Sequence, residues 1–409
     1  MSVIVEIISM GIKEAKESER IISVKKISEY FKNRDKIYLI MLAGFVLRLL
    51  FILLDNNFDF LPYDWDTTQY HIIAMQIKEN ILADNSIFSN VTPSISYRSY
   101  SFFSAILYII FGSYEIVIRI FNAFLGILIA KKVYDIVLLT KLNDKIATYV
   151  AFLLTFWPSF FLFTSINMRE SLIIFITCDL IIRYIKLYSK KEYHFIILAV
   201  DFILLALLRK QNLPLYLFII ILHFLFEQFR KKSKRFKLKA GLIIVILIFC
   251  GIIIIDSNLD LLSFKYFSAQ MEARTRGGSA YLAWMEYDSI IDIFKYLPLR
   301  FLYFTFGPFI WDIENLFMFF VFLQSSVLIV LSLLTVKYFY DSGFKANREM
   351  IFLLIFMLMG LVSNSLVDAN YGTSFRHRMP YIIPLFIFSS EYLKRLFDIF
   401  LSWISSFKV

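Results

Sequence analysis

The run Ile37–Leu54 reads IYLIMLAGFVLRLLFILL, and after a short polar link it is followed by Pro62–Ala74, which reads PYDWDTTQYHIIA. The first run is almost entirely apolar and is long enough to cross ~30 Å of hydrocarbon as a helix. Backbone groups in lipid must satisfy their own hydrogen bonds, so a run of this length predicts a helix rather than a barrel strand. In the second stretch Asp64 and Asp66 stand one residue apart beside the membrane segment, where charge is least expected.

Composition extends this interpretation to the whole chain of 409 residues. Hydrophobic residues make up 59% of it, and the mean hydropathy is +0.68, far above an ordinary soluble domain. The net charge of +10 comes from Lys and Arg in short connectors between apolar runs, as cytoplasmic loops require, so it does not indicate nucleic-acid binding. Cys178 and Cys250 lie inside apolar runs and predict neither a disulfide framework nor a metal site. The sequence therefore predicts an all-α polytopic membrane protein.

The distribution of lysine and arginine predicts about ten transmembrane helices with both termini in the cytoplasm. Residues 1–36 mix apolar and basic residues and predict an amphipathic segment on the cytoplasmic membrane surface. Residues 37–404 form the transmembrane module, with no soluble C-terminal domain. Its outer loops are expected at 55–99, 256–314 and 367–379.

The expected spans follow the apolar runs Ile37–Leu54, Tyr114–Leu139, Ile146–Ser165, Leu172–Leu187, His194–Leu208, Leu213–Phe229, Ala240–Ile255, Asn315–Tyr338, Met350–Leu366 and Met379–Ile404. Two further apolar stretches, Ser99–Gly112 and Leu297–Trp311, are expected as helices that lie along the outer face or dip into it.

Ionisable residues gather on the outer side in this topology. If the chain is helical from Thr67, then Asp66, Tyr70 and Ala74 fall at i, i+4 and i+8, which places an acid and a phenol on one face. The other interpretation of Asp66 is as the cap of a short interfacial helix. The outer side also carries Arg169-Glu170 and the triplet Arg376-His377-Arg378. Charged groups held at membrane depth are costly and usually functional.

A carboxylate cluster with arginines at a bilayer surface suits transfer from a lipid-borne phosphate. Cations must hold the phosphate as charge grows on it, and the acceptor hydroxyl needs a carboxylate as general base. We therefore expect Asp66 as the base and Arg98, Arg376 and Arg378 on the phosphate. The alternative for each arginine is that it snorkels to lipid headgroups.

Several short motifs together carry a resemblance to a known family. They are Asp66-x-x-x-Tyr70-x-x-x-Ala74, the run Tyr97–Gly112, the run Arg119–Gly126, the segment from Trp157-Pro158 to Glu170, and Asn370–Pro380. In this combination, which covers most of the chain, the sequence resembles the GT-C glycosyltransferases. It is most similar to their protein mannosyltransferase and aminoarabinose-transferase branch. It departs from them in lacking their lysine-proline or double proline before the second helix, and in having Glu170 where an aspartate is commoner.

The resemblance implies a GT-C architecture with juxtamembrane helices on the outer face. It implies a polyprenyl-phosphate-linked sugar donor, and a glycan, lipid or protein acceptor, on the outer face of the cytoplasmic membrane. Asp66 takes the place of the catalytic base and Glu170 that of the second acid, with Asp64 beside them as a further catalytic carboxylate. The substrate-binding residues expected around them are Tyr70, Arg98, Arg169, Arg376, His377 and Arg378.

Other interpretations remain beside this one. Asp64 and Asp66 could hold a divalent cation, since hard cations take oxygen ligands, although no cofactor is required. His71 and His377 could act in proton transfer or serve as polar interface residues. A transporter or flippase for a lipid-linked glycan would keep its charges near the middle of its spans, and a surface-polysaccharide polymerase or ligase would use similar arginines.

Overall fold

A computed structural model describes residues 36–59, 61, 64–91, 94–231, 264–275, 279–343 and 346–406. The N-terminal segment 1–35, the basic residues 232–239 and the expected span Ala240–Ile255 lie outside the described residues. Within the described ranges every regular element is a helix, and the one β-bridge joins Ala280 to Asn370. The prediction of an all-α fold is confirmed for this part of the chain.

The helices are Lys36–Phe58, α2 (Asp64–Leu82), α3 (Ile95–Phe111), α4 (Glu115–Leu139), α5 (Asp144–Thr155), α6 (Pro158–Phe163), α7 (Glu170–Ile185), η1 (Lys186–Lys190), α8 (Phe195–Leu208), α9 (Asn212–Lys231), α11 (Phe264–Arg274), α12 (Ile290–Phe306), η2 (Ile310–Asp312), α13 (Leu316–Asp341), α14 (Arg348–Ser365), α15 (Tyr371–His377) and α16 (Met379–Ser406).

Three of the described helices are long and apolar enough to cross a membrane, namely Lys36–Phe58, Met318–Asp341 and Arg348–Ser365. Helices α3 and α4 pass the same test as a pair, but they are bent by 111° at the break between them. Gly112 in that break has φ of 97°, a backbone conformation that residues other than glycine rarely adopt. These helices identify a helical membrane protein.

Several helix starts follow from short polar signals. The side chains of Asn143, Asn315, Asn347 and Asn370 accept hydrogen bonds from the first backbone N–H groups of α5, α13, α14 and α15, which otherwise lack partners. The expected single span Ile146–Ser165 is instead two helices, because Pro158 cannot continue the hydrogen-bonding of α5 and begins α6. The chain is helical from Thr67 onward, and this helix, α2, starts before that residue. That helix begins at Asp64 and places Asp66 in its first turn, where a carboxylate suits the helix dipole.

Arg48 braces the break between α5 and α6 from within the first helix. Its side chain is buried, its Nη2 donates to the carbonyl of Thr155 at 3.0 Å, and its Nε donates to Oγ1 of Thr164 at 2.7 Å. The Thr155 carbonyl ends α5 and would otherwise be left unpaired in an apolar setting. Arg48 is therefore explained as a structural residue.

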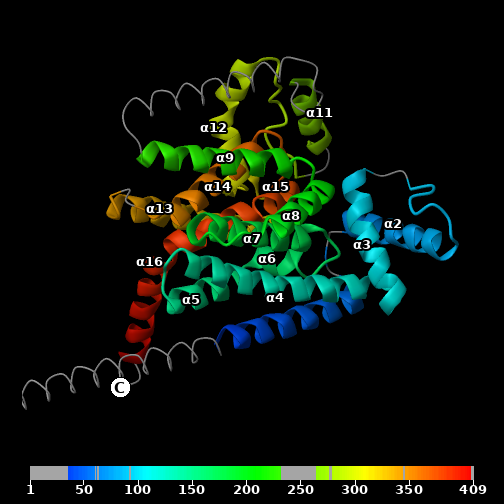
Figure 1. The fold of residues 1–409 in the computed structure, drawn as a ribbon, viewed down its shortest axis with the longest axis horizontal. Coiled ribbons are helices and arrows are strands. Elements are labelled where there is room, and N and C mark those ends of the chain that lie inside the picture. The colour runs from blue at the N-terminus through cyan, green and yellow to red at the C-terminus, as the bar shows by residue number, and fades with distance from the viewer. Residues whose placement is uncertain are drawn as a thin grey trace, which may run out of the picture.

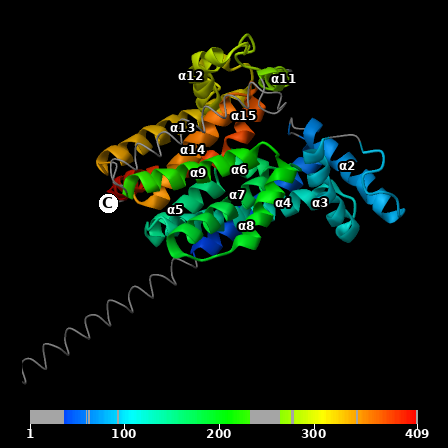
Figure 2. The same cartoon turned by 45° about the horizontal axis from the view of Figure 1, so that its top comes forward.

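Helices α2 and α3 stand side by side at one end of the bundle of longer helices (Figures 1 and 2). Ile73, Ile77, Val91 and Ala105 form a small apolar core between them. The stretch 55–99, expected as an outer loop, is thus largely helical. Helix α15 is short and lies between α14 and α16 in the chain; Arg376 and His377 are its last two residues, and Arg378 follows it directly.

Candidate functional site

Asp66 and Arg376, 310 residues apart in the sequence, meet in a salt bridge. Nη1 of Arg376 lies 2.6 Å from Oδ2 of Asp66, and the hydroxyl of Tyr97 donates to Oδ1 at 3.0 Å. The Asp66 side chain remains 24% exposed and that of Arg376 14%. A partly accessible carboxylate therefore lies between a guanidinium and a phenol contributed by α15 and α3.

Electrostatics keeps this carboxylate ionised. Burial by itself raises the pKa of Asp66, but the charge and hydrogen bond of Arg376, with the hydroxyl of Tyr97, outweigh it and hold the pKa below its ordinary value. Asp66 is therefore a carboxylate at neutral pH. It would become a stronger base if Arg376 turned to another anion, because the group that lowers its pKa would then be shared.

Glu170, the first residue of α7, forms a second ion pair behind the first. Nη2 of Arg209 lies 3.0 Å from Oε1 of Glu170, and the two side chains are only 2% and 4% exposed. The turn before Glu170 is held by Asn122, whose Nδ2 donates to the carbonyls of Ile166 at 2.7 Å and Met168 at 3.0 Å. A buried amide on α4 thus fixes the backbone that positions Glu170.

Arg169 and Tyr70 complete the wall beside Asp66. The guanidinium of Arg169 lies over the ring of Tyr97, with 5.5 Å from Cζ to the ring centroid, and its Nη1 donates to the carbonyl of Leu208 at 3.2 Å. The ring of Tyr70 stacks on that of Tyr97 with centroids 4.8 Å apart. The structure therefore brings together five expected site residues: Asp66, Tyr70, Arg169, Glu170 and Arg376. With their partners Tyr97 and Arg209 they form the Asp66 cluster.

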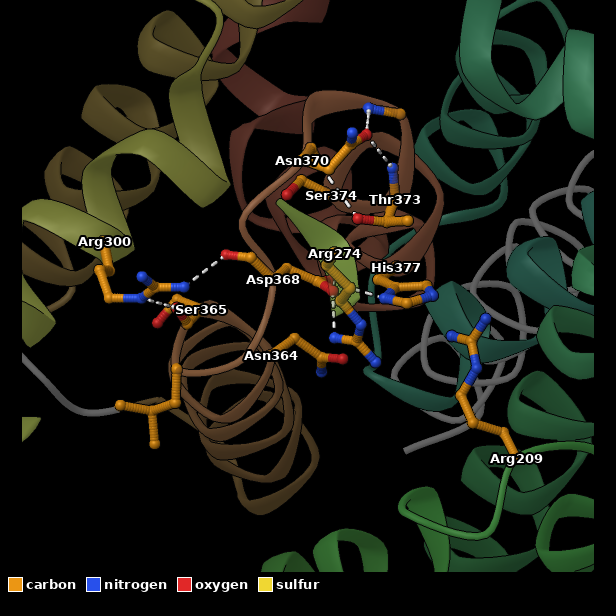
Figure 3. A network of polar contacts seen from close by, with 12 residues as sticks. Arg209, Arg274, Arg300, Asn364, Ser365, Asp368, Asn370, Thr373, Ser374 and His377 are labelled. Atoms are coloured by element: carbon orange, nitrogen blue, oxygen red, sulfur yellow. Dashed lines mark hydrogen bonds and ion pairs between the residues drawn. The ribbon is translucent and has the colours of Figure 1, made fainter. Parts of the chain in front are cut away.

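His377 contacts Asp368 in a third buried charge group, drawn in Figure 3. Its Nδ1 lies 2.7 Å from Oδ2 of Asp368, Arg274 pairs with the other carboxylate oxygen, and Nη2 of Arg300 donates to the Asp368 carbonyl at 2.8 Å. Despite burial, the charge of Arg274 and the interaction with His377 lower the pKa of Asp368 to about 2. Burial, with the charge of Arg209 adding to it, lowers the pKa of His377 to about 4, so the imidazole is neutral at neutral pH.

Several donors of this cluster are left without partners. Within the described residues, Nε of Arg169, Nε of Arg209 and Nε of Arg376 are buried and make no hydrogen bond, and the same holds for Oε2 of Glu170. Most buried polar groups in proteins are paired. Three guanidiniums thus keep an unused N–H beside the carboxylates of Asp66 and Glu170, which indicates a site for an anionic ligand.

Two expected phosphate ligands do not join the cluster. Arg98 lies over the ring of Phe88, with 5.9 Å from Cζ to the centroid, and the described contacts connect it to no residue of the Asp66 cluster. Arg378 is 1% exposed. Its guanidinium donates to the carbonyls of Thr305 at 2.8 Å and Gly307 at 3.1 Å and to Oγ of Ser325 at 2.9 Å. The expectation that Arg378 lies free at headgroup depth is wrong, because carbonyls at the end of α12 occupy it.

This geometry predicts a stability role for Arg378. Arg378→Met keeps the volume but leaves those buried carbonyls unpaired, and we expect a loss of about 2–3 kcal/mol in unfolding free energy. The measurement is thermal or denaturant unfolding of the purified protein. Arg98→Met, which removes one cation–π contact, should cost about 1 kcal/mol or less. Unchanged stability of Arg378→Met would contradict this role.

A metal centre receives no support from the described residues. Among them no group of three or more His, Cys, Asp or Glu side chains is placed to hold an ion. The side chain of Asp64 lies outside the described part of the structure, so its pairing with Asp66 stays a prediction. His71 contacts the hydroxyl of Tyr108 at 2.7 Å and serves as a polar packing residue.

Two cavities are formed in this part of the structure. A polar one of about 270 Å³ is lined by Asp55, Asp59, Leu61, Thr67, Thr68, Glu115, Arg119 and Ile166; Thr67 directly follows Asp66. An apolar one of about 380 Å³ lies at the elbow between α3 and α4 and is lined by Phe45, Leu107, Phe111, Val117, Ile120, Phe121 and Phe124.

Sequence reasoning missed Tyr97 and Arg209 as members of the Asp66 cluster, and Asp368 as the partner of His377. Arg209 follows an apolar run on the expected outer side, which is the same signal that singled out Arg169-Glu170.

Comparison of the sequence with protein-family models and with curated proteins finds no match. The resemblance to GT-C enzymes therefore stays a prediction.

Proposed function

We propose that this protein is a membrane glycosyltransferase of GT-C architecture that moves a sugar from a polyprenyl-phosphate donor to an acceptor hydroxyl. The acceptor is a glycan, a lipid or a protein. The observation that carries the proposal is the ion pair between Asp66 and Arg376, because it joins a candidate base to a candidate phosphate ligand at a partly exposed position.

In the transfer step Asp66 accepts a proton, and Arg376 stabilises negative charge on the phosphate. The acceptor oxygen attacks the anomeric carbon, its proton passes to the Asp66 carboxylate, and the bond from the anomeric carbon to the phosphate oxygen breaks with its electron pair on the phosphate. Arg376 turns its unused Nε and part of its charge to that phosphate, with Arg169 beside it, and stabilises the growing negative charge. As Arg376 shares its charge, the pKa of Asp66 rises toward the ordinary value, which strengthens the base as the donor binds.

The two cavities differ in polarity, as the sugar and the isoprenoid chain of the donor do. The polar cavity next to Thr67 has carboxylates and a guanidinium in its wall, which suit the hydroxyl groups of a sugar or acceptor. The apolar cavity at the α3–α4 elbow is lined by aliphatic and aromatic residues alone, and suits an isoprenoid chain. Leu107 is ten residues along α3 from Tyr97, a distance of about 15 Å.

We further propose about ten spans with both termini in the cytoplasm and the Asp66 cluster at the outer face of the cytoplasmic membrane. In this topology α2, α3 and α12 are juxtamembrane helices, since α3 leaves α4 at 111°. The lysine-rich connectors support the orientation.

Cysteine labelling tests that orientation. In a variant without Cys178 and Cys250, Ser86→Cys in the α2–α3 loop should react with an impermeant thiol reagent on intact cells. Lys190→Cys, at the end of η1, should react only after permeabilisation. Both positions are exposed, so access to the reagent depends on the side of the membrane. Labelling of Lys190→Cys in intact cells would reverse the orientation and move the Asp66 cluster to the cytoplasm.

The activity itself is tested by reconstitution. Purified protein in liposomes is given polyprenyl-phosphate donors with radiolabelled sugars and a membrane extract as acceptor. The proposal expects label to move from the lipid to the acceptor at a rate set by protein and donor concentrations. Label that crosses the bilayer while still on the lipid would instead indicate a flippase.

One observation favours a transporter as the second candidate. Lys132 on α4, Asp179 and Arg183 on α7 and Asp201 on α8 form a connected set of ion pairs. Lys132, Asp179 and Asp201 lie inside their helices, and Arg183 lies in the last turn of α7. This set was not anticipated by the expectation that charge gathers at the outer ends of the spans. Ionisable groups inside membrane helices mark ion and substrate pathways in transporters. A flippase would depend on Asp201 and tolerate loss of Asp66, whereas the transferase would show the opposite order.

A further inference from the structure

A second polar cavity, of about 750 Å³, lies at the other end of the bundle. Its wall is formed where α4 ends near Leu139, by η1, by Arg230 near the end of α9, and by residues Asn347–Glu349 at the start of α14. Helix α7, 16 residues long, begins at Glu170 in the Asp66 cluster and ends at Ile185 in this wall. The two sites are thus separated by about 24 Å. Nothing in the proposed transfer chemistry uses this cavity.

The wall carries an excess of positive charge. Its charged side chains are the basic Lys141, Lys186, Lys190, Arg230 and Arg348, and the acidic Asp135 and Glu349. Asp135 is already paired with Lys131 at 2.6 Å, outside the wall, and Glu349 accepts a hydrogen bond from Ser189. Neither acid makes an ion pair with a basic residue of the wall among the described contacts. The cavity therefore favours an anion of more than one charge.

The two arginines are held in place by a single buried carboxylate. Glu227 on α9 is fully buried, and its oxygens lie 3.5 Å from Nε of Arg230 and 3.3 Å from Nε of Arg348. Tyr188 of η1 also donates to Glu227, at 3.4 Å, and its ring lies under the guanidinium of Arg348. One carboxylate cannot neutralise two guanidiniums. Because their Nε edges face Glu227, the arginines are positioned but keep charge for a ligand.

Lys141 and Lys190 supply the adaptable part of the wall. Both are exposed, and within the described ranges neither makes an ion pair. They stand on different connectors, between α4 and α5 and at the end of η1. The N-terminus of α14, with Arg348 in its first turn, adds the positive end of a helix dipole on the same side.

We infer that this cavity binds a phosphate-bearing ligand with at least two negative charges, such as a pyrophosphate or an anionic phospholipid headgroup. Positioned arginines recognise phosphate through paired N–H donors, and lysines add point charge. The volume lies within the range of small-molecule sites, and basic pockets between membrane helices are known to take lipid headgroups. A purely topological role for these cations would require their charge but not their grouping around a cavity.

Binding of two probes to the full-length protein tests the inference. One arm titrates inorganic pyrophosphate calorimetrically into protein held in nanodiscs of zwitterionic phospholipid. The other arm uses native mass spectrometry to compare retention of a short-chain cardiolipin, whose headgroup carries two phosphates, with that of a phosphatidylcholine of the same chains. The test variant is Lys141→Gln with Lys190→Gln. The control is Lys210→Gln with Lys295→Gln, which removes the same charge from exposed positions outside the wall.

The inference expects at least one probe to bind the wild-type protein and to bind the test variant about tenfold or more weakly, with the control unchanged. Pyrophosphate binding would assign the site to a soluble ligand, and selective retention of cardiolipin would assign it to a headgroup. Failure of both probes to bind the wild-type protein would overturn the inference. Equal weakening in the test variant and in the control would also overturn it, because net charge alone would then explain binding. None of these outcomes depends on Asp66 or on sugar transfer.

Discussion

Asp66→Asn is expected to lower the rate of sugar transfer by about 10²–10⁴-fold, the contribution usually assigned to a general base. Asparagine keeps the size of the side chain and can still accept the hydrogen bond of Tyr97, but it cannot take the proton of the acceptor. The measurement is the initial rate of transfer in liposomes at saturating donor, with unfolding of the same sample followed in parallel. Donor binding should persist, because Arg376 and Arg169 remain.

Asp84→Asn is the matched control. Asp84 lies in the loop after α2, is exposed and has φ of 55°, a backbone conformation that asparagine accepts. The Asp84→Asn variant therefore removes the same charge without touching the Asp66 cluster, and it should transfer sugar at the wild-type rate. If Asp66→Asn kept wild-type turnover while remaining folded, Asp66 could not be the base.

Arg376→Ala is expected to reduce turnover by about 10²–10³-fold and to weaken donor binding as well. Removal of the guanidinium takes away the counter-ion of Asp66 and part of the positive charge around Glu170, which keeps its ion pair with Arg209. The phosphate therefore meets an uncompensated Asp66 carboxylate. Charge on the leaving phosphate grows in the transition state, so both affinity and rate should suffer. Transfer rate measured against donor concentration separates the two effects.

Arg376→Lys and Arg98→Lys distinguish recognition from simple charge. Lysine at position 376 keeps a cation for Asp66 but loses the planar set of donors, so an intermediate loss of affinity and rate is expected. Lysine at position 98 should leave the kinetics unchanged, since Arg98 contacts Phe88 and not the cluster. Wild-type kinetics in Arg376→Lys and Arg376→Ala would assign Arg376 to packing or anchoring and remove it from the site.

Much of the helical framework could be predicted from hydropathy. Helices α13, α14 and α16 begin within two residues of the expected runs, because long apolar segments bounded by Asn caps and charged connectors leave few alternatives. The division of the expected single span Ile146–Ser165 at Pro158 was not predicted, although a proline inside an apolar run is a signal for a helix break. Hydropathy does not show, however, that the expected loop at 55–99 folds into α2 and α3, since short amphipathic helices at an interface resemble polar loops.

The candidate site was predictable only in part. Asp66, Glu170 and Arg376 stood out because each is charged beside an apolar run. Which charge pairs with which depends on the lateral order of the helices, and a single sequence does not give that order. Arg378 is next but one to Arg376, yet the helical turn of α15 sends one guanidinium to Asp66 and the other to the end of α12. Sequence proximity therefore assigned both arginines to one role, whereas the structure separates them.

Native mass spectrometry of the protein purified in mild detergent tests the donor class most directly. The proposed mechanism predicts a bound species with the mass of a polyprenyl phosphate or a polyprenyl-phosphate sugar on the wild-type protein. The same species should be retained by Asp66→Asn, which keeps the phosphate ligands, and lost from Arg376→Ala. Equal occupancy by this lipid in the wild-type protein and in Arg376→Ala, or its absence from wild-type protein supplied with the purified donor, would contradict the mechanism.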